Sequence, residues 1–544
     1  MRTGAGGRDV TVPPGGPLTL CRPGGRPGFA RAPSYAPALP LVSLDDATPE
    51  RGDRLRVRCS TGPHRPAEAC RGLPRPAEAC RGLTIRRPTR PVALTKDAGC
   101  MKMRGPDAIM ALLQESCRLP VTAAAVAVFP GPAPTREQMH HRVGHRLAPV
   151  RRLRLRPDTD GAGLLRRPYS WHVAEKLDVS RHVTHDRLCR GQRLEDAMAD
   201  LVRRSMPDAA GGPLWELRVV QDAAPGHFAL VLRAHHALLD GASLFTVLRL
   251  LGDDKPGTAL PSPDGLEAEP TVTVGVRTVV HAVAGMLRPA GRYPCNEPVD
   301  EGRTVGWHGI SADVMEAARN ALPEGRTSPN NVFLAAFTAA VRACPDLLGQ
   351  GPRLDRVYAA VPVDLRGPQA PYALGNYVSA VRVRMPLETA DPLARLREVG
   401  HQMQENKRLR RAEGMTWLAD HVVGLGAAGA RVFVRRLFGG RSPATFTCTF
   451  PRWGTDALVL YGRTAESVIA MPNLAARMGI MALLSQHADR FHLCLAADDA
   501  HRAYTRPLAE AFVAEMHALA MTGSQSPAAP HREPRETEPP VPAE

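Results

Sequence analysis

Apolar and polar residues recur with both helical and strand periods between about residue 105 and residue 252. An apolar run from Phe228 to Leu232 ends at a polar turn, which is typical of a buried strand. The segment Ala242–Leu251 that follows has the spacing of a helix. Upstream, Trp171–Val173 predicts a strand and Arg193–Arg204 an amphipathic helix. This mixture predicts an α/β domain, which we place at residues 104–252.

A second body of the same kind follows a linker. Residues 253–270 have the composition of a linker, and Thr271–Leu287 is an apolar segment consistent with a crossing helix. We therefore assign residues 253–303 to a linker and crossing segment, and residues 304–522 to a second α/β domain. The patterns within that domain predict one helix and three strands, at Asn331–Cys344, Val357–Val361, Val378–Val383 and Phe491–Ala496.

The two ends of the chain lack such patterns. Residues 1–103 are rich in Pro, Gly and Arg, and Arg65–Pro74 (RPAEACRGLP) is repeated directly at Arg75–Thr84 (RPAEACRGLT). Two short copies are too few to build a repeat fold. We interpret residues 1–103 as a disordered or non-native extension, and we expect a chain that begins at Met101 to fold. The composition of residues 523–544, rich in Pro and Glu, predicts a disordered tail.

Composition and charge argue against several classes of function for this protein. The chain of 544 residues has a net charge of +16, and residues 1–100 supply more than half of it with 17 Lys and Arg against 8 Asp and Glu. Because aromatic residues are only 5%, this balance does not predict a nucleic-acid-binding face. Attraction to an anionic membrane surface and arginine-rich codon usage remain two alternatives. The 11 cysteines form no CxxC pair and predict neither a zinc site nor a disulfide framework.

The sequence predicts neither a signal peptide nor a membrane span. Residues 1–20 lack a continuous apolar core. The longest uncharged stretch, Leu119–Thr135, contains several prolines and is too short to cross a bilayer. We expect a cytoplasmic protein that associates peripherally, if at all, with the inner membrane face or with lipid droplets.

Candidate chemistry lies where the Phe228–Leu232 strand ends, in the stretch HHALLDG from His235 to Gly241. Imidazole has the pKa nearest neutrality, so a histidine held at a strand end suits general-base catalysis. Asp240 can orient the ring or the loop, and Gly241 permits backbone geometry that other residues resist. Adjacent histidines on a strand point to opposite faces, which disfavours joint metal binding. With no GxSxG and no HExxH in the chain, His236 is better interpreted as a base that acts directly on a bound acceptor.

This HHxxxDG pattern resembles that of the CoA-dependent acyltransferase superfamily, and its neighbours resemble elements of the wax ester synthase/diacylglycerol acyltransferase family. Pro213-Leu214-Trp215 resembles the PLW element of that family, and Asn330-Asn331-Val332 its NDVVLA helix start. Val361–Arg366 (VPVDLR) resembles its VPVSxR strand end, and Gly375-Asn376 its GN element. The order and spacing match from about Gly105 to about Leu519, roughly three quarters of the chain.

The resemblance implies an α/β fold of the two-domain, chloramphenicol-acetyltransferase-like kind, with a tunnel between the halves. It implies an O-acyltransferase that moves a fatty acyl group from acyl-CoA to diacylglycerol or a fatty alcohol, giving triacylglycerol or wax ester. His236 would be the general base, and His235 and Gly241 would shape the site. Asp240 would hold the loop through an arginine, for which Arg151 and Arg152 are candidates. The implied substrate-binding residues are Pro213, Leu214, Trp215, Asn330, Asn331, Arg366, Gly375 and Asn376. No metal or prosthetic group is implied, because acyl-CoA is a substrate.

Two departures from the family pattern keep alternatives open. Asn331 stands where the family has Asp, and Thr447–Gly454 (TCTFPRWG) stands where it has a TNVPGP-like stretch. One alternative is a same-fold acyltransferase of polyketide, peptide or glycolipid assembly that uses carrier-bound acyl groups. The other is a paralogue that binds lipid without turnover.

A GxGxxG match at Gly424–Gly429 invites a nucleotide-binding interpretation. No acidic residue occurs between Asp420 and Asp456, although a dinucleotide site needs one about 20 positions on. We interpret the match as part of an apolar helix, Trp417–Leu437, whose end carries Arg431, Arg435 and Arg436. Core packing and contact with a membrane or an acyl chain are both open explanations of that helix.

Overall fold

The structure is a computed structural model that describes most of residues 100–525. The parts of this range that it leaves undescribed are 118–119, 159–169, 205, 207–212, 255–260, 268–272, 425, 439–442, 452–453, 455 and 476. The sequence repeat at residues 65–84 and most of the two predicted terminal extensions, 1–103 and 523–544, lie outside the described residues.

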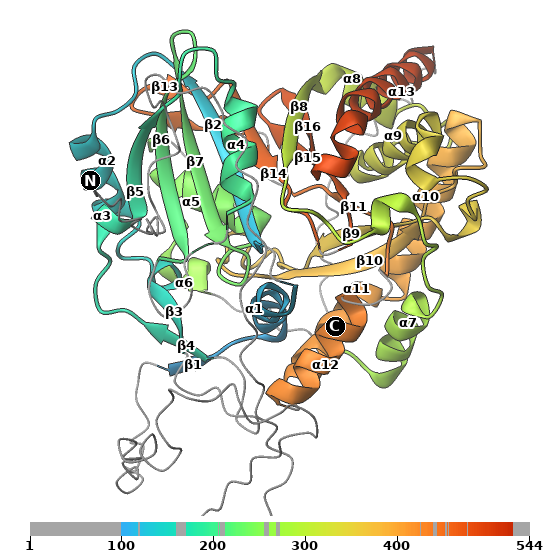
Figure 1. Ribbon diagram of the computed structural model, residues 1–544, viewed down its shortest axis with the longest axis horizontal. Coiled ribbons are helices and arrows are strands. Elements are labelled where there is room, and N and C mark those ends of the chain that lie inside the picture. Colours follow the sequence, from blue (N-terminus) through green and yellow to red (C-terminus); the bar gives the residue numbers. More distant parts are fainter. Residues whose placement is uncertain are drawn as a thin grey trace, which may run out of the picture. The chain divides into compact units, whose positions relative to one another are not determined.

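The first half is built on a mixed sheet with the strand order β14-β2-β7-β6-β5 (Figure 1). The strands are β2 (Thr122–Pro130), β5 (Val183–Arg187), β6 (Trp215–Ala224), β7 (His227–His235) and β14 (Ser467–Met471). β7 is central, antiparallel to both β2 and β6, and nearly all of its side chains are buried. A strand covered on both faces is apolar throughout, which explains the uninterrupted run Phe228–Leu232 and confirms the strand predicted there.

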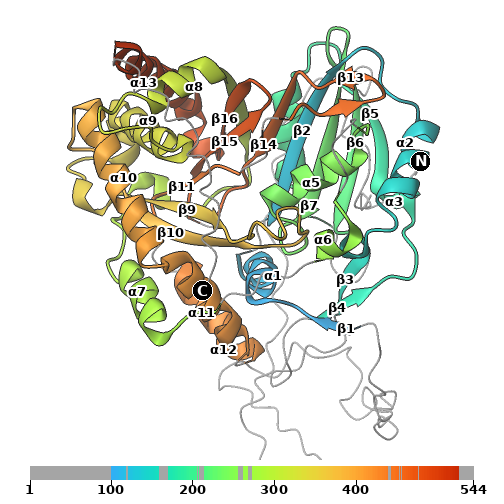
Figure 2. The same cartoon turned by 180° about the vertical axis from the view of Figure 1, so that it is seen from behind.

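The second half is built on another mixed sheet, with the order β10-β9-β11-β15-β16-β8 (Figure 2). The strands are β8 (Thr304–Ser311), β9 (Tyr358–Asp364), β10 (Val378–Arg384), β11 (Phe446–Thr449), β15 (Ile480–His487) and β16 (Arg490–Ala497). β11 runs parallel to both of its neighbours, and the other pairs are antiparallel. The predicted strands at 357–361, 378–383 and 491–496 are confirmed as β9, β10 and β16.

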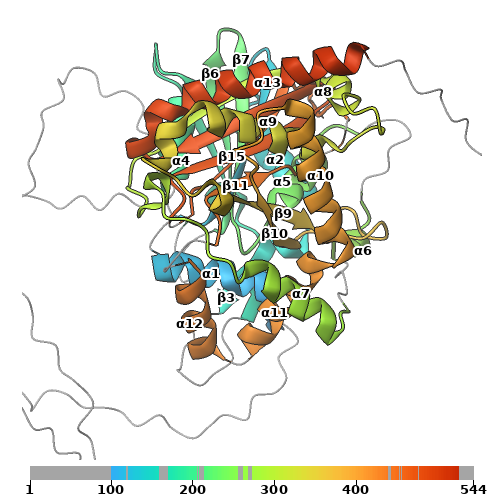
Figure 3. The same ribbon diagram turned by 90° about the vertical axis from the view of Figure 1, so that its right-hand side faces the viewer.

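Helices cover the sheets in layers. The helices of the first half and the segment that follows are α1 (Gly105–Cys117), α2 (Arg136–Arg146), α3 (Val179–His182), α4 (Leu194–Val202), α5 (Gly241–Leu251), α6 (Pro263–Glu267) and α7 (Val276–Met286). Those of the second half are α8 (Ala312–Arg319), α9 (Pro329–Ala343), α10 (Pro392–Arg408), α11 (Arg411–Gly424), α12 (Ala427–Phe438) and α13 (Thr505–Gln525). Helices α8, α9, α10 and α13 cover one face of the second sheet, where its main apolar core lies (Figure 3).

Small elements complete the described part of the chain. A three-stranded sheet has the order β1-β4-β3, with β1 (Cys100–Lys102), β3 (Leu155–Asp158) and β4 (Ser170–Val173), and β12 (Val459–Leu460) pairs with β13 (Arg463–Thr464). Short 3-10 turns lie at Arg151–Arg154, Pro294–Asn296, Pro345–Leu348, Leu354–Arg356 and Asp499–Tyr504. The strand predicted at Trp171–Val173 and the helix at Arg193–Arg204 are confirmed as β4 and α4.

One strand crosses between the halves. β14 lies at residues 467–471, far into the second half of the chain, yet it forms the edge of the first sheet by pairing antiparallel with β2. Helix α4 of the first half in turn packs against β8 of the second, and an apolar cluster joins the two. The two halves predicted from sequence therefore share core and strands, and the boundaries at 252 and 304 stay predictions.

The predicted helix Trp417–Leu437 is wrong as a single element. The chain forms α11 and α12 instead, separated at Gly426, whose φ of +112° is a conformation that only glycine adopts without strain. The segment before the GxGxxG match is thus the helix α11, and a dinucleotide fingerprint needs a strand there. Helix α9 begins earlier than predicted, at Pro329, and Ser328 caps it rather than Asn330 or Asn331.

Candidate functional site

His235 is the last residue of β7 and His236 is the first residue after it, where neighbouring segments still hold the backbone. The His235 N–H donates to the Leu214 carbonyl at 2.8 Å, and the His236 N–H donates to the Val121 carbonyl at 2.9 Å. Successive residues of an extended strand point to opposite faces. The neighbouring segments therefore fix the backbone that carries both rings, and the opposite orientation of the two imidazoles stays a prediction.

His235 is buried and has a fixed protonation state. Its Nδ1 accepts a hydrogen bond from the Ala237 N–H at 3.0 Å, so the ring proton of the neutral imidazole must be on Nε2. Burial, helped by the neighbouring His236, lowers the pKa of His235 to about 4. This ring is neutral at physiological pH and accepts a hydrogen bond within the turn, and its role in shaping the site stays a prediction.

Two carboxyl groups, those of Asp240 and Asp107, contribute to the electrostatic environment of His236. Its side chain keeps part of its surface accessible, while Nδ1 is buried and makes no hydrogen bond to any described residue. Burial lowers the pKa of His236, and the charges of Asp240 and Asp107 act against that effect by favouring the protonated ring. The arrangement gives a neutral imidazole that can accept a proton, near the ionised Asp240, whose charge stabilises the imidazolium once it forms, and near Asp107, which favours the imidazolium as well.

Asp240 caps helix α5 and ties it to the second half. Its Oδ1 accepts from the Ser243 N–H and from Arg366 Nη2, both at 2.9 Å, and its Oδ2 accepts from the Tyr377 N–H at 2.9 Å. Burial opposes ionisation, but the charge of Arg366 and these hydrogen bonds outweigh it and lower the pKa of Asp240. Asp240 therefore stays ionised and holds the turn in place.

Arg366 is the partner of Asp240, so the prediction of Arg151 or Arg152 was wrong. Arg151 lies 3.7 Å from Glu267. Arg152 instead donates to the Ala237 and Leu238 carbonyls of the histidine turn and to Asp107. The true pairing crosses the two halves of the chain, and proximity in sequence could not reveal it.

The Gly375-Asn376 element lies directly against Asp240. The Gly375 carbonyl accepts from the Asp240 N–H at 3.0 Å, and the Ser243 hydroxyl bonds to both backbone groups of Gly375. Asn376, which follows, is buried, and neither its amide oxygen nor its amide nitrogen has a partner among the described residues. Asn376 is thus an unsatisfied polar group next to the Asp240 anchor.

Gly241 does not need the special backbone geometry expected of it. It is the first residue of α5, and its φ is not among the positive values. A Cβ added there would make ordinary contact, at 3.5 Å, with Pro451. Pro451 belongs to the TCTFPRWG stretch, whose first residues form β11, so this departure from the family pattern reaches the histidine turn. Its Arg452 and Trp453 lie outside the described residues.

The PLW element is placed in the core. Leu214 and Trp215 are buried in the main apolar cluster of the first half, and Pro213 is partly exposed. The Trp215 indole N–H donates to the Leu153 carbonyl at 2.9 Å, and the ring packs on His182 at a centroid distance of 4.1 Å. The polar atom of Trp215 is already paired, so packing accounts for this residue and its substrate-binding role stays a prediction.

Asn330 and Asn331 lie at the start of α9. The Asn331 side chain donates to the Thr327 hydroxyl at 3.2 Å, and the buried Asn330 Oδ1 has no partner among the residues that the structure covers. None of these contacts reaches His236 or Asp240. Their predicted role in substrate binding therefore stays a prediction.

Sequence reasoning missed Asp107, Ser243 and Tyr377. Ser243 had a signal, because an acidic residue three positions before a backbone N–H at a helix start is typical of an N-cap. Asp107 and Tyr377 had none, since each meets the turn only through the fold. In the described part of the chain, no three His, Cys, Asp or Glu side chains gather as metal ligands would.

Comparison with known proteins agrees with this geometry. Residues 103–294 match the model of the wax ester synthase/diacylglycerol acyltransferase catalytic domain, and residues 374–520 match the C-terminal domain model of the same family. A probable diacylglycerol O-acyltransferase of Mycobacterium tuberculosis is 29% identical over 347 residues, covering 58% of this chain and 70% of that protein.

Solved structures share the fold. A wax ester synthase/diacylglycerol acyltransferase from Marinobacter aquaeolei is 18% identical with a TM-score of 0.55, covering 77% of this chain and 100% of that one. The first condensation domain of the calcium-dependent antibiotic synthetase is 14% identical with a TM-score of 0.57, covering 79% and 98%. Both have two sheet-containing halves of the chloramphenicol-acetyltransferase-like kind, as predicted from sequence.

Proposed function

Because the chain belongs to the wax ester synthase/diacylglycerol acyltransferase family, we propose that it transfers a fatty acyl group from acyl-CoA to diacylglycerol, a fatty alcohol or both. The products would be triacylglycerol and wax ester. The observation that carries the proposal is the neutral His236 ring beside the buried Asp240 and Asp107 carboxylates. A general base needs this combination of an available lone pair and a stabilised conjugate acid.

The reaction uses His236 twice. The ring takes the proton of the acceptor hydroxyl while the oxygen attacks the thioester carbonyl and forms a tetrahedral oxyanion. As the carbonyl reforms, the C–S bond breaks, and the imidazolium returns its proton to the leaving CoA thiolate. Asp240 and Asp107 favour the imidazolium that exists between the two steps. No metal or prosthetic group takes part in this scheme.

The test is ester formation by the purified full chain with radiolabelled palmitoyl-CoA. Diacylglycerol and hexadecanol are offered separately, and the same acyl group is offered on an acyl-carrier protein. We expect ester from the CoA thioester with at least one of the two alcohols. Product only from the carrier-bound acyl group would favour the carrier-dependent alternative. No product from any pair, with the protein folded and binding palmitoyl-CoA, would favour the non-catalytic lipid-binding alternative.

We further propose that the protein associates peripherally with lipid surfaces. No helix in the described parts of the chain has the length and apolar character to cross a membrane. Helix α7 carries an exposed apolar stripe instead: Val276 is 80%, Val280 57%, Val283 38% and Leu287 72% exposed. Residues 273–296 contain three arginines and no Asp or Glu. An apolar stripe flanked by cations is typical of helices that lie in an anionic membrane interface.

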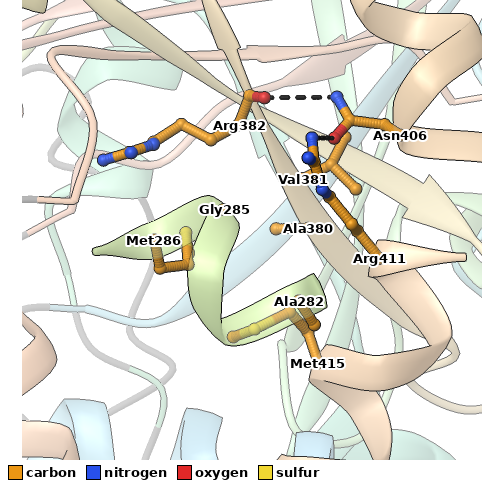
Figure 4. A pocket seen from close by; sticks show the side chains of 9 residues that line it. All are labelled: Ala282, Gly285, Met286, Ala380, Val381, Arg382, Asn406, Arg411 and Met415. Atoms are coloured by element: carbon orange, nitrogen blue, oxygen red, sulfur yellow. Dashed lines mark hydrogen bonds between the residues drawn. The ribbon is translucent and has the colours of Figure 1, made fainter. Parts of the chain in front are cut away.

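The opposite face of α7 is anchored to the protein. Ala282, Gly285 and Met286 of α7 line a small pocket against β10 and α11, with Arg411 and Asn406 hydrogen-bonded at 2.9 Å on its far side (Figure 4). Gly414 of α11 approaches so closely that an added Cβ would lie 2.7 Å from the Thr278 carbonyl oxygen. One face of α7 is therefore packed closely against the protein, and the apolar stripe lies on the exposed face.

Helix α12 (Ala427–Phe438) contributes less exposed apolar surface than α7 among the described side chains. Figures 1 and 3 place α7 and α12 on either side of α11. Of the run Val432–Val434, Val432 is exposed but Val434 is buried, and Arg431 lies 3.7 Å from Glu115. Arg435 is exposed on the same helix and adds a positive charge there.

Liposome flotation tests the association. Binding to anionic vesicles should weaken between low and high salt, because the Debye length is about 10 Å at 0.1 M. Replacing Arg431, Arg435 and Arg436 with Glu should weaken it too, and V280E/L287E should abolish most of it. Met521→Glu is the matched control, since Met521 is 67% exposed on α13 in the other helical layer. Salt-independent binding, or equal loss in the control, would contradict the proposal.

A further inference from the structure

A cluster of polar side chains lies next to the histidine turn. Asp107 comes from α1, Arg152 from the 3-10 turn Arg151–Arg154, and Trp171 from β4. Arg152 Nη2 lies 3.0 Å from Asp107 Oδ2, and the Trp171 indole N–H donates to the same oxygen at 3.2 Å. Three segments that are distant in sequence thus converge on one carboxylate.

Arg152 connects this cluster to the turn. Its Nε donates to the Leu238 carbonyl at 2.9 Å and its Nη2 donates to the Ala237 carbonyl at 3.0 Å. These are the two residues that follow His236, and both are buried. Buried carbonyls need donors, and a guanidinium can serve two of them at fixed geometry. We propose that Asp107 and Arg152 position the His236 ring by holding the backbone of Ala237 and Leu238.

The turn is consequently held at both of its ends. Asp240 is fixed by Arg366 and by the Tyr377 N–H on the side of the second half. Ala237 and Leu238 are fixed by Arg152 on the side of the first half. His236 lies between these anchors, and Figures 1 and 2 show α1, which carries Asp107, beneath the ends of β2 and β7.

Stability alone is a poor explanation of the Asp107–Arg152 pair. The Asp107 side chain is 1% exposed, and its Oδ1 has no partner among the described residues. A buried ion pair with an unsatisfied oxygen contributes little to folding, and an apolar replacement is often as stable. Burial raises the pKa of Asp107, while Arg152, Trp171 and Arg104 favour its ionised form. The Asp107–Arg152 pair is better explained by its effect on the position and the charge environment of His236.

The inference rests on the proposed function of His236. The charge of Asp107 also affects the pKa of the His236 ring. The charged groups around the ring are Asp240 and Asp107, which act on it directly, and the arginines bonded to them, Arg366 and Arg152, with Arg104 beside Asp107. Removing the Asp107 charge removes a group that favours the imidazolium. The pKa of His236 should then fall, and the acid limb of the pH–rate profile should move to lower pH.

The experiment compares three variants of the full chain. We expect Asp107→Asn to lower kcat by about 10- to 100-fold, since a small misplacement of a catalytic group can cost that much, with the KM for palmitoyl-CoA within about threefold. Arg152→Lys keeps the charge but loses the two-carbonyl geometry, so kcat should fall without a displacement of the acid limb. Asp186→Asn is the matched control, because Asp186 is also 1% exposed and paired with an arginine, Arg218, at 3.2 Å, yet has no contact with the turn.

Hydrogen exchange separates this inference from the proposed function. Amides of the peptide spanning residues 236–240 should exchange at least tenfold faster in Asp107→Asn and in Arg152→Lys than in the wild type or in Asp186→Asn. This result is expected even if no acyl acceptor is turned over. Unchanged exchange of the peptide, or a loss of activity equal to that of Asp186→Asn with an unmoved acid limb, would overturn the positioning role.

Discussion

Arg366 Nη2 lies 2.9 Å from Asp240 Oδ1, and the two side chains are only 3% and 0% exposed. The pair joins residues 126 positions apart, and so links the turn after β7 to the segment after β9. Ser243, Gly375 and the Tyr377 N–H complete the set of hydrogen bonds around it. The histidine turn is therefore built jointly by the two halves of the fold.

Arg366→Ala should be strongly destabilising. Removing one partner leaves the Asp240 carboxylate buried without its cation, which typically costs about 3–5 kcal/mol. Urea unfolding followed by circular dichroism measures this loss. Arg249→Ala is the control, because Arg249 pairs with Asp456 at 2.7 Å but Asp456 is 52% exposed. That variant should lose no more than about 1 kcal/mol, and an equal loss in both would contradict the account of the pair.

His235→Asn should retain much of the activity and most of the stability. An Asn side-chain oxygen can accept from the Ala237 N–H as the Nδ1 of His235 does. His235→Ala offers no acceptor, so it should lose about 1–3 kcal/mol through the unpaired buried amide. Chemical denaturation and steady-state rates are compared for both. If both variants lose activity completely while remaining folded, His235 has a chemical role that the turn geometry does not explain.

The stability of the protein should decrease as the pH falls from about 6.5 towards 4. The pKa values of His182, His235 and His492 are each lowered to about 4 by burial. In that window the unfolded chain binds a proton at each histidine and the folded chain does not. Each such group therefore contributes about 1.4 kcal/mol per pH unit to the slope.

His492→Gln tests this pH dependence. Its slope of unfolding free energy against pH, from urea titrations at a series of pH values, should be smaller than that of the wild type by about 1.4 kcal/mol per pH unit. The exposed His401 provides the control, and His401→Gln should leave the slope as it is. Identical slopes in all three proteins would show that burial of His492 does not exclude its protonated form.

Trp215→Phe should affect stability more than substrate binding. The variant leaves the buried Leu153 carbonyl without its donor, for which the cost is about 1–3 kcal/mol. The KM for palmitoyl-CoA of the folded variant should stay within about threefold of the wild type. A large rise in KM with unchanged thermal stability would instead support the substrate-binding role that the family resemblance implies for the PLW element.

The sequence was sufficient where the signal is local. β7, α5 and the HHALLDG turn follow from a buried apolar run, a helical period and two adjacent imidazoles, all within 25 residues. The break between α11 and α12 was missed because Gly426 lies in an apolar segment that continues the helical pattern on both sides. Hydrophobic periodicity identifies the apolar face of a helix, but it does not detect a single residue with a positive φ.

The sequence was insufficient where partners meet through the fold. The family resemblance suggested Arg151 and Arg152 as partners of Asp240, but Arg152 donates to the turn carbonyls and to Asp107, and the partner is Arg366 of the second half. β14 likewise completes the first sheet from 467–471. Pairings between residues more than 100 positions apart leave no periodic pattern in one sequence, so they become visible only in the folded structure.

The most direct measurement is the rate of ester formation by His236→Ala under conditions where the wild type is active. Folding is verified by thermal unfolding, and palmitoyl-CoA binding is measured separately. A positioned base contributes about 10²- to 10⁴-fold to the rate, so kcat should fall by at least two orders of magnitude while binding changes little. A folded His236→Ala protein that forms ester at close to the wild-type rate would contradict the account.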